Sequence, residues 1–292
     1  MNALLDRLPA DTRKKAAEVG RKIAFPFARA SAPLRLTPNY VIAGAQRAGT
    51  TSLYRYLVQH PDVGKVRLGK GVHYFDTNAT APMNWYKAHF PIDPDRIPLW
   101  DGPRTVGEGS PYYMFHPAVP SRLKAAFPQI KVIVILRDPV ERAHSQWAHE
   151  SARQYETLGF LEALEAEEGR LQGEETRLVA ELGATSFSHQ HHSYAARGQY
   201  ATQVQRLWDT FGQDHVLVLS ATSMFADPHT AYSQTLDFLG LRKHTAKYDV
   251  HNARSYPPID APALGFLNHN LGDSNERLVT MLGPEFDFRR RD

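Results

Sequence analysis

The segment GAQRAGTT has the residue types and spacing of a phosphate-binding loop. Gly44 and Gly49 are separated by four residues, like the two glycines of a Walker A loop. A Walker A loop continues with lysine, whereas this chain continues with Thr50 and Thr51. The residue that reaches the β- and γ-phosphates of a nucleoside triphosphate is therefore missing, and Arg47 places a fixed cation inside the loop instead. We interpret the loop as the site of a smaller anion, such as one 5′-phosphate; the alternative is a tight turn without a ligand.

A second candidate anion site lies in the segment LRDPVERAHSQW. Arg137 follows an unbroken apolar run, 131–136, which we predict to be a buried strand. Ligands of open α/β sheets bind at the carboxyl ends of strands, where Arg137 would lie. Ser145 comes eight residues later, about two helical turns on, so both side chains can face one phosphate. Alone, Arg-Asp-Pro would equally fit a salt-bridged start of a helix.

Strands and helices alternate along the chain in a way that positions both motifs. Apolar periodicity predicts strands at 40–45, 72–75, 104–106, 131–136 and 215–219. It predicts helices at 51–59, 84–90, 117–127, 141–151, 160–182, 200–211, 231–239 and 264–282. This order indicates a P-loop-like, doubly wound α/β fold with a mainly parallel central sheet, flanking helices and helical insertions. We predict a basic N-terminal arm at 1–37 and a single domain at 38–292.

Composition limits the classes of function. The chain has 292 residues, 42% of them hydrophobic, and no cysteine, which excludes disulfides, thiolate metal sites and a cysteine nucleophile. A net charge of +3 is not that of a general nucleic-acid binder, but it suits an enzyme that handles small anions. We found no apolar run of the roughly 18 residues that span a membrane, and the first residues lack the apolar core of a signal peptide. These features predict a cytoplasmic protein.

The first 36 residues are more basic than the rest. They carry eight Lys or Arg against three Asp or Glu, interleaved with Leu4, Leu5, Leu8, Val19 and Ile23. A basic amphipathic arm can lie on anionic lipid, which would make the protein peripheral at the inner membrane face. The alternatives are a helix that packs on the body of the protein and a loose arm, and basic helices more often form a solvated face.

The two anion motifs together resemble those of the sulfotransferases, in particular the Golgi-type carbohydrate branch with the heparan sulfate sulfotransferases and their bacterial relatives. The segments VHYFD, NWYKAHFP, VGEGSPYY, RGQYATQVQRLW and NERLVTMLGPEF fit the same pattern, so the resemblance runs from about residue 40 to 288. It implies the donor 3′-phosphoadenosine 5′-phosphosulfate (PAPS) and the product 3′-phosphoadenosine 5′-phosphate (PAP), with no metal. Two separate anion pockets would explain the missing lysine.

The resemblance also implies roles for individual residues. The 5′-phosphosulfate would be held by Arg47, Ala48, Gly49, Thr50, Thr51 and Ser52. The 3′-phosphate would be held by Arg137 and Ser145. Arg197 would be a further donor contact, although a surface arginine before a helix is an equal interpretation. Arg47 stands where the relatives usually have lysine; it is expected to stabilise the bridging oxygen rather than protonate it.

The general base is the point at which this chain departs from the family. The heparan sulfate enzymes place a glutamate two residues before the histidine of the VHYFD-like motif, and here that position is Gly71. His73 is the first candidate because a neutral imidazole accepts a proton near pH 7, and Asp76 could orient it. Glu108, in VGEGSPYY, is the second candidate. A packing histidine and a loop-capping carboxylate are the respective alternatives, and Lys70 can add positive charge near the donor.

Other clusters carry weaker signals. His189, His191 and His192 lack the i, i+4 spacing of a zinc helix, so we predict no metal site there. The cluster can instead border an acceptor cleft. Most aromatic residues in the motif segments are expected in the core, although some could stack on a sugar. They are Trp85, Tyr86, Tyr112, Tyr113 and Trp147.

The sequence therefore predicts a sulfotransferase that moves a sulfuryl group from PAPS to a hydroxyl, or less favourably an amine, of a carbohydrate, glycolipid or small metabolite. One alternative is a P-loop nucleotide kinase, which would need Mg²⁺. Another is a catalytically degenerate protein that binds PAPS without turnover. The acceptor, the oligomeric state and the choice between His73 and Glu108 are open.

Overall fold

Five short segments form one parallel sheet in this computed structural model, which describes residues 25–66, 70–97, 99–248 and 258–288. The strands are β1 (Tyr40–Gly44), β2 (Val63–Gly64), β3 (Thr105–Glu108), β4 (Lys131–Leu136) and β5 (Val216–Ser220). Their order is β2-β3-β1-β4-β5, and every neighbouring pair is parallel. The chain first builds the sheet on one side of β1 and then crosses to the other, so the carboxyl end of β1 is a switch point where such folds bind ligands.

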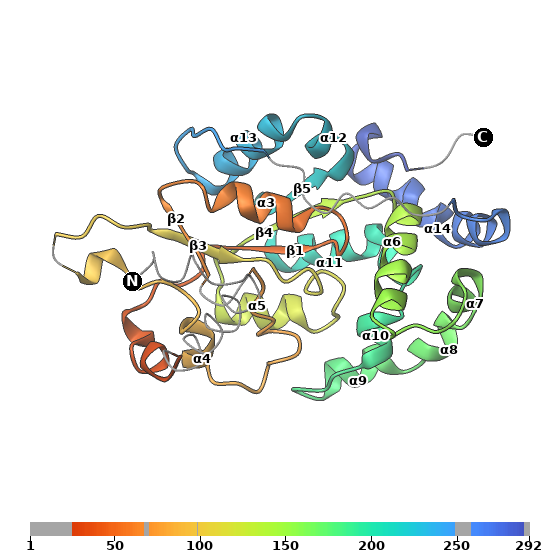
Figure 1. Ribbon diagram of the computed structural model, residues 1–292, viewed down its shortest axis with the longest axis horizontal. Helices are drawn as coiled ribbons and strands as arrows, with labels where there is room; N and C mark the ends of the chain where they lie inside the picture. Colours follow the sequence, from red (N-terminus) through yellow and green to blue (C-terminus); the bar gives the residue numbers. More distant parts are fainter. Residues whose placement is uncertain (1–24, 67–69, 98, 249–257, 289–292) are drawn as a thin grey trace, which may run out of the picture.

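Helices cover both faces of the sheet, as Figure 1 shows: α3, α12 and α13 lie on one face, and α5 and α11 on the other. Helices α6 to α10 stand together beyond the carboxyl ends of the strands. The helices are α3 (Thr50–Leu57), α4 (Met83–Lys87), α5 (Val119–Ala126), α6 (Pro139–Ala152), α7 (Phe160–Glu165), α8 (Glu167–Leu171), α9 (Glu174–Ala180), α10 (Phe187–His191), α11 (Tyr200–Phe211), α12 (Ala221–Ala226), α13 (Pro228–Leu239) and α14 (Ala261–Leu282). The predicted doubly wound α/β fold is confirmed.

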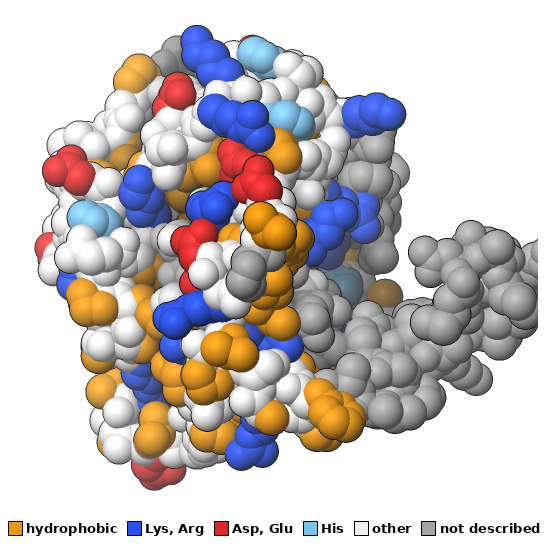
Figure 2. All heavy atoms as spheres, turned by 90° about the vertical axis from the view of Figure 1, so that its left-hand side faces the viewer, with side chains coloured by type: hydrophobic (Ala, Val, Ile, Leu, Met, Phe, Trp, Pro, Cys, Tyr) orange, Lys and Arg blue, Asp and Glu red, His pale blue; other side chains and the backbone are white. Residues whose placement is uncertain are grey.

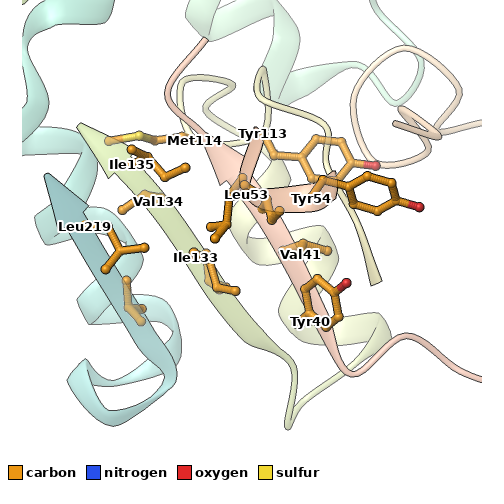
Figure 3. Close-up of a cluster of buried hydrophobic side chains, with 14 of the residues drawn as sticks. Tyr40, Val41, Leu53, Tyr54, Tyr113, Met114, Ile133, Val134, Ile135 and Leu219 are labelled. Carbon is orange, nitrogen blue, oxygen red and sulfur yellow. The ribbon is translucent and has the colours of Figure 1, made fainter. Parts of the chain in front are cut away.

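The core is built around β1 and β4. Every residue of β1 is buried, and so are all residues of β4 after Lys131. Figure 3 shows this cluster, to which β1 contributes Val41, α3 contributes Leu53 and β4 contributes Ile133 and Ile135. Strands buried on both faces need continuous apolar runs, which explains the sequence of β4. This packing fixes the ends of β1 and β4, from which the two anion motifs begin.

Most predicted elements are confirmed, with small shifts at their ends, but the strand predicted at 72–75 is wrong. This segment is irregular, and the second strand in chain order is β2. The backbone N–H of Val72 donates to the Glu108 carboxylate at 2.6 Å, and His73 has a φ of 54°. A donor used by a side chain and a left-handed residue are both incompatible with a strand ladder. The predicted helical insertion at 160–182 is divided into α7, α8 and α9.

The described part of the predicted N-terminal arm packs on the domain. Residues 25–30 are helical, and the buried Arg35 donates to the carbonyls of Ala28 at 2.9 Å and Phe90 at 2.5 Å. Residues 1–24 lie outside the described residues, so the arm at 1–37 stays a prediction. Within the part of the chain that the structure describes, no helix is long and apolar enough to cross a membrane.

Candidate functional site

The loop between β1 and α3 has the geometry of an anion cradle. Arg47 and Gly49 both have left-handed backbones, with φ of 70° and 98°, so the chain turns sharply before α3 begins at Thr50. A left-handed arginine is strained and is held by its surroundings. No side chain caps the amino end of α3, which therefore presents its first amides and the hydroxyls of Thr50 and Thr51 to a ligand.

The two anion motifs touch one another. The Arg47 Nε donates to the Ser145 Oγ at 3.1 Å, although the two residues are 98 positions apart. Arg137, directly after β4, donates from Nη1 to the Arg47 carbonyl at 3.4 Å and pairs with Glu141 at 2.9 Å. Asp138 caps α6 by accepting from the amides of its first turn. The chain thus brings three of the predicted donor-binding residues to one edge of the sheet.

Lys70 contacts the two threonines that stand where a Walker A loop has its lysine and its serine or threonine. The Lys70 Nζ donates to the Thr50 Oγ1 at 2.7 Å and to the Thr51 Oγ1 at 3.2 Å. Burial lowers the pKa of Lys70 to about 7, although the nearby Glu108 carboxylate opposes this shift. A lysine from a separate loop therefore supplies the missing cation. From its place in the sequence, Lys70 is expected only to add positive charge near the donor, and no contact with the anion loop is predicted.

His73 and Asp76 form a hydrogen-bonded pair beside Lys70. The His73 Nδ1 lies 2.8 Å from the Oδ2 of Asp76, whose side chain is fully buried. Burial acts to lower the pKa of His73, but the hydrogen bond and charge of Asp76, with the charge of Glu108, raise it overall. Because Nδ1 is held by a carboxylate, Nε2 is the ring nitrogen that can accept a proton from a substrate.

Glu108 is fully buried and contacts the segment that carries Val72 and His73. Its carboxylate accepts from the Val72 amide and the Ser110 hydroxyl at 2.6 Å each, from Tyr113 at 2.8 Å and from Tyr86 at 3.2 Å. Burial raises the pKa of Glu108, and these hydrogen bonds oppose the shift. The Ser110 hydroxyl in turn accepts from the His73 amide at 3.0 Å. These contacts favour a positioning role for Glu108, one of the two predicted bases.

A cavity of about 330 Å³ opens in front of Lys70 and His73. Its wall includes Gln46 of the anion loop, Gly71, Tyr112, Arg153, His191 and Arg197. Arg153, at the end of α6, and His191, at the end of α10, belong to the helices beyond the sheet edge. No motif in the sequence marked Arg153, because only the fold brings it to the same cavity as His73.

Arg197 lies at the back of this cavity and is buried. Its Nη1 donates to the Gln46 side chain, and its Nη2 donates to the carbonyls of His189 at 2.9 Å and Gln190 at 2.7 Å. These contacts tie the anion loop to α10, so the guanidinium holds the cavity wall in place. Its predicted contact with the donor stays a prediction.

The three histidines near α10 point to different partners. The Nδ1 of His189 lies 2.6 Å from the Tyr112 hydroxyl, that of His191 lies 3.1 Å from Glu150, and the Nε2 of His192 lies 2.9 Å from the Tyr155 carbonyl. Within the described residues, no group of three His, Cys, Asp or Glu is arranged to hold a metal ion.

Comparison with known proteins places the chain in a family. A family model described as a sulfotransferase domain matches residues 37–255, and the chain therefore belongs to the sulfotransferase family. It is similar to a sulfotransferase of known structure from Alicyclobacillus acidocaldarius, with 30% identity and a TM-score of 0.63, over 84% of this chain and 96% of that one.

Curated relatives include human heparan sulfate glucosamine 3-O-sulfotransferase 6, which is 30% identical over 83% of this chain and 64% of the relative. Human bifunctional heparan sulfate N-deacetylase/N-sulfotransferase 3 is 25% identical over 84% of this chain and 30% of the relative. The membrane-associated sulfotransferase kil1 of Dictyostelium discoideum is 22% identical over 86% and 66%. The chain thus spans between about a third and two thirds of the length of these relatives. The predicted family and its transferase class are confirmed.

Proposed function

We propose that the protein transfers a sulfuryl group from PAPS to a hydroxyl of a carbohydrate. The contact between Arg47 and Ser145 carries the proposal, because it joins two anion sites beside one cavity. PAPS has a 5′-phosphosulfate and a separate 3′-phosphate, which need two such sites. The loop from Arg47 to Ser52, with Lys70, would hold the first group, and Arg137 with Ser145 the second. When bound, the donor supplies the activated sulfuryl group.

In this proposal His73 is the general base. The Nε2 of His73 takes the proton of the acceptor hydroxyl while the acceptor oxygen bonds to sulfur and the bond from sulfur to the phosphate oxygen breaks. Asp76 holds the ring and stabilises the imidazolium that forms. Lys70 and Arg47 stabilise the negative charge on the sulfonate and the leaving phosphate. The proton ends on His73 and the electron pair of the broken bond ends on PAP.

Gly71 supports His73 as the base. A Cβ at Gly71 would lie 2.8 Å from the carbonyl oxygen of Gly109 and 3.3 Å from the Nε2 of His73. The two segments are held at this distance by a hydrogen bond from the Gly109 amide to the Lys70 carbonyl. A glutamate at this position would require the backbone to move, and its side chain would start against the imidazole. His73 therefore faces the space from which the glutamate of the relatives would act.

Replacing Lys70 by arginine is expected to change the pH profile. A lysine is charged below its pKa and neutral above it, so the catalytic efficiency toward the donor should fall as pH rises through about 7. Lys70→Arg keeps the charge throughout, and this alkaline fall should disappear. The measurement is kcat/KM for PAPS between pH 6 and 9, with the exposed Lys65→Arg as control. An unchanged alkaline limb in Lys70→Arg would assign the fall to another group.

The acceptor is proposed to be a carbohydrate for two reasons. Polar side chains dominate the cavity wall, including Gln46, Lys70, His73 and Arg153, which suits a ligand with many hydroxyl groups. Two of the relatives are named for action on heparan sulfate. The test is incubation with PAPS and an unsulfated glucosamine-containing oligosaccharide in the presence of a chelator. Mass spectrometry should find the sugar with one added sulfuryl group and an equal amount of PAP; release of PAP without sulfated sugar would exclude this acceptor.

We further propose that the protein contacts an anionic membrane through large apolar side chains that are exposed on two adjoining segments: Phe27, Leu34, Ile97, Leu99 and Trp100. Figure 2 shows a face of the molecule on which hydrophobic side chains lie among those of Lys and Arg. Leu34 and Asp93 are joined by a backbone hydrogen bond of 2.9 Å, which places the segments side by side. Leu99 is fully exposed and left-handed, with a φ of 63°. A tryptophan beside an exposed leucine suits the interface of a bilayer, and the basic residues 1–24 precede this face. A membrane-associated relative adds support.

Replacing the exposed apolar side chains of Leu99 and Trp100 should release the protein from vesicles. The double substitution Leu99→Ser and Trp100→Ser is expected to weaken binding to phosphatidylserine-containing vesicles by about tenfold or more, because each side chain loses its burial in lipid. Co-sedimentation measures this, with the exposed Val179→Ser as control. Equal sedimentation of both variants, or no sedimentation of the unaltered protein, would contradict the proposal. A cytoplasmic location stays a prediction.

A further inference from the structure

The cavity continues into an aromatic rim that the proposed chemistry does not use. Tyr155 follows α6 and Phe187 begins α10, and their ring centroids are 5.3 Å apart. Both rings also contact His191, with centroid separations of 4.9 and 4.6 Å. Yet Tyr155 is 39% exposed and Phe187 is 52% exposed. Two neighbouring aromatic rings that leave this much surface in water are placed to receive a ligand rather than to fill the core.

The rim is continuous with the catalytic cavity. Arg153 and His191 both line the cavity that also contains His73. The guanidinium carbon of Arg153 lies 4.1 Å from the centre of the Tyr155 ring. A ligand that reaches His73 through this cavity therefore passes Arg153 and His191 and, if it is longer than one unit, extends over the two aromatic rings.

A buried carboxylate positions Arg153 and His191, the two side chains that connect the aromatic rim to the cavity. The side chain of Glu150 is fully buried, and its Oε2 accepts from the Arg153 Nη1 and lies 3.1 Å from the Nδ1 of His191. These bonds orient a guanidinium and an imidazole toward the same opening. Gln154 turns the chain after α6 with a φ of 60°, a conformation usually left to glycine, and thereby brings Tyr155 back beside Arg153. Strain of this kind is common at sites that must place a side chain for function.

We propose that Arg153, Tyr155, Phe187 and His191 form a second acceptor subsite, which binds the sugar unit next to the one that receives the sulfuryl group. The inference rests on the proposed function and narrows its acceptor to an oligosaccharide or an extended glycoside. The C–H face of a pyranose ring packs on exposed aromatic rings, while the N–H groups of Arg153 and His191 can bond its hydroxyls. A single sugar would fill only the cavity at His73.

Direct sugar binding tests this subsite without requiring turnover. Calorimetry with PAP-saturated protein would compare an unsulfated tetrasaccharide of alternating glucosamine and glucuronic acid with glucosamine alone. The tetrasaccharide should bind more tightly than glucosamine. Phe187→Ala and Tyr155→Ala should each weaken tetrasaccharide binding by about tenfold and leave glucosamine and PAP binding unchanged. Leu182→Ala, an exposed residue of the same helical insertion, is the control. Because both aromatic residues are exposed, their variants should keep the melting temperature of the parent.

The outcomes separate this inference from the proposed function. If both variants bind the tetrasaccharide like the parent protein, or if the tetrasaccharide binds no better than glucosamine, the subsite is wrong even when PAPS is the donor. If PAP does not bind, the sugar titration is repeated without it. If the tetrasaccharide then binds and the Tyr155→Ala and Phe187→Ala variants weaken that binding, the subsite is supported, whereas PAPS as the donor is contradicted.

Discussion

The His73→Ala variant is expected to lose sulfuryl transfer by about two to four orders of magnitude while its affinity for PAP stays within about twofold. The reason is geometric. The imidazole of His73 lines the cavity next to Lys70, and the buried carboxylate of Asp76 orients it at 2.8 Å. Removing it leaves the anion loop and Lys70 in place, so the donor should still bind. The measurements are the rate of sulfuryl transfer at saturating donor and the dissociation constant of PAP.

The control for this prediction is His269→Ala, a substitution of an exposed histidine on α14. Asp76→Asn should lower the rate of sulfuryl transfer less than His73→Ala does, because the imidazole remains but loses the carboxylate charge that orients it. Full activity of His73→Ala would contradict His73 as the base. If Glu108→Gln then lost activity without a change in melting temperature, Glu108 would take that role despite its buried position.

The Arg137→Ala variant is expected to bind PAP about 100-fold more weakly, because a charge-assisted hydrogen bond to phosphate is lost. Arg137 lies at the carboxyl end of β4, and the loop carbonyl of Arg47 accepts from its Nη1. The loss should be smaller for adenosine 5′-phosphosulfate, which lacks the 3′-phosphate. This difference assigns Arg137 to the 3′-phosphate rather than to the donor as a whole.

Arg242→Ala is a matched control for this prediction, since Arg242 also pairs with an acid, Asp62, but on the surface. Surface ion pairs of this kind contribute little, so PAP binding should not change. If Arg137→Ala weakened the two nucleotides equally, Arg137 would instead act on the 5′ group or on the shape of the loop.

The fold and the turn between β1 and α3 could be predicted because local sequence determines them. The apolar run of β4 needs burial on both faces, and glycine spacing marks the turn between β1 and α3. The predicted strand at 72–75 is wrong, although its apolar residues resemble a strand. Its backbone conformation depends on the Glu108 carboxylate, 36 residues away from Val72. A hydrogen-bond partner at that separation leaves no local pattern.

The contacts of the side chains that line the cavity could not be predicted for the same reason. Lys70 reaches Thr50 across 20 residues, and Arg153 meets His191 only through the buried Glu150. None of these residues has a distinctive spacing in the sequence. The histidines near α10 were noted for their clustering, but their separate partners are visible only in the fold.

The central claim, a donor with two separate anions, is tested most directly by calorimetric titration with PAP in the absence of magnesium, alongside ATP with magnesium. We predict micromolar or tighter binding of PAP, unaffected by a chelator, and much weaker binding of ATP. Tight binding of magnesium-ATP without binding of PAP would contradict a donor with two separate anions. It would instead favour the loop GAQRAGTT as the phosphate-binding loop of a nucleoside triphosphate enzyme.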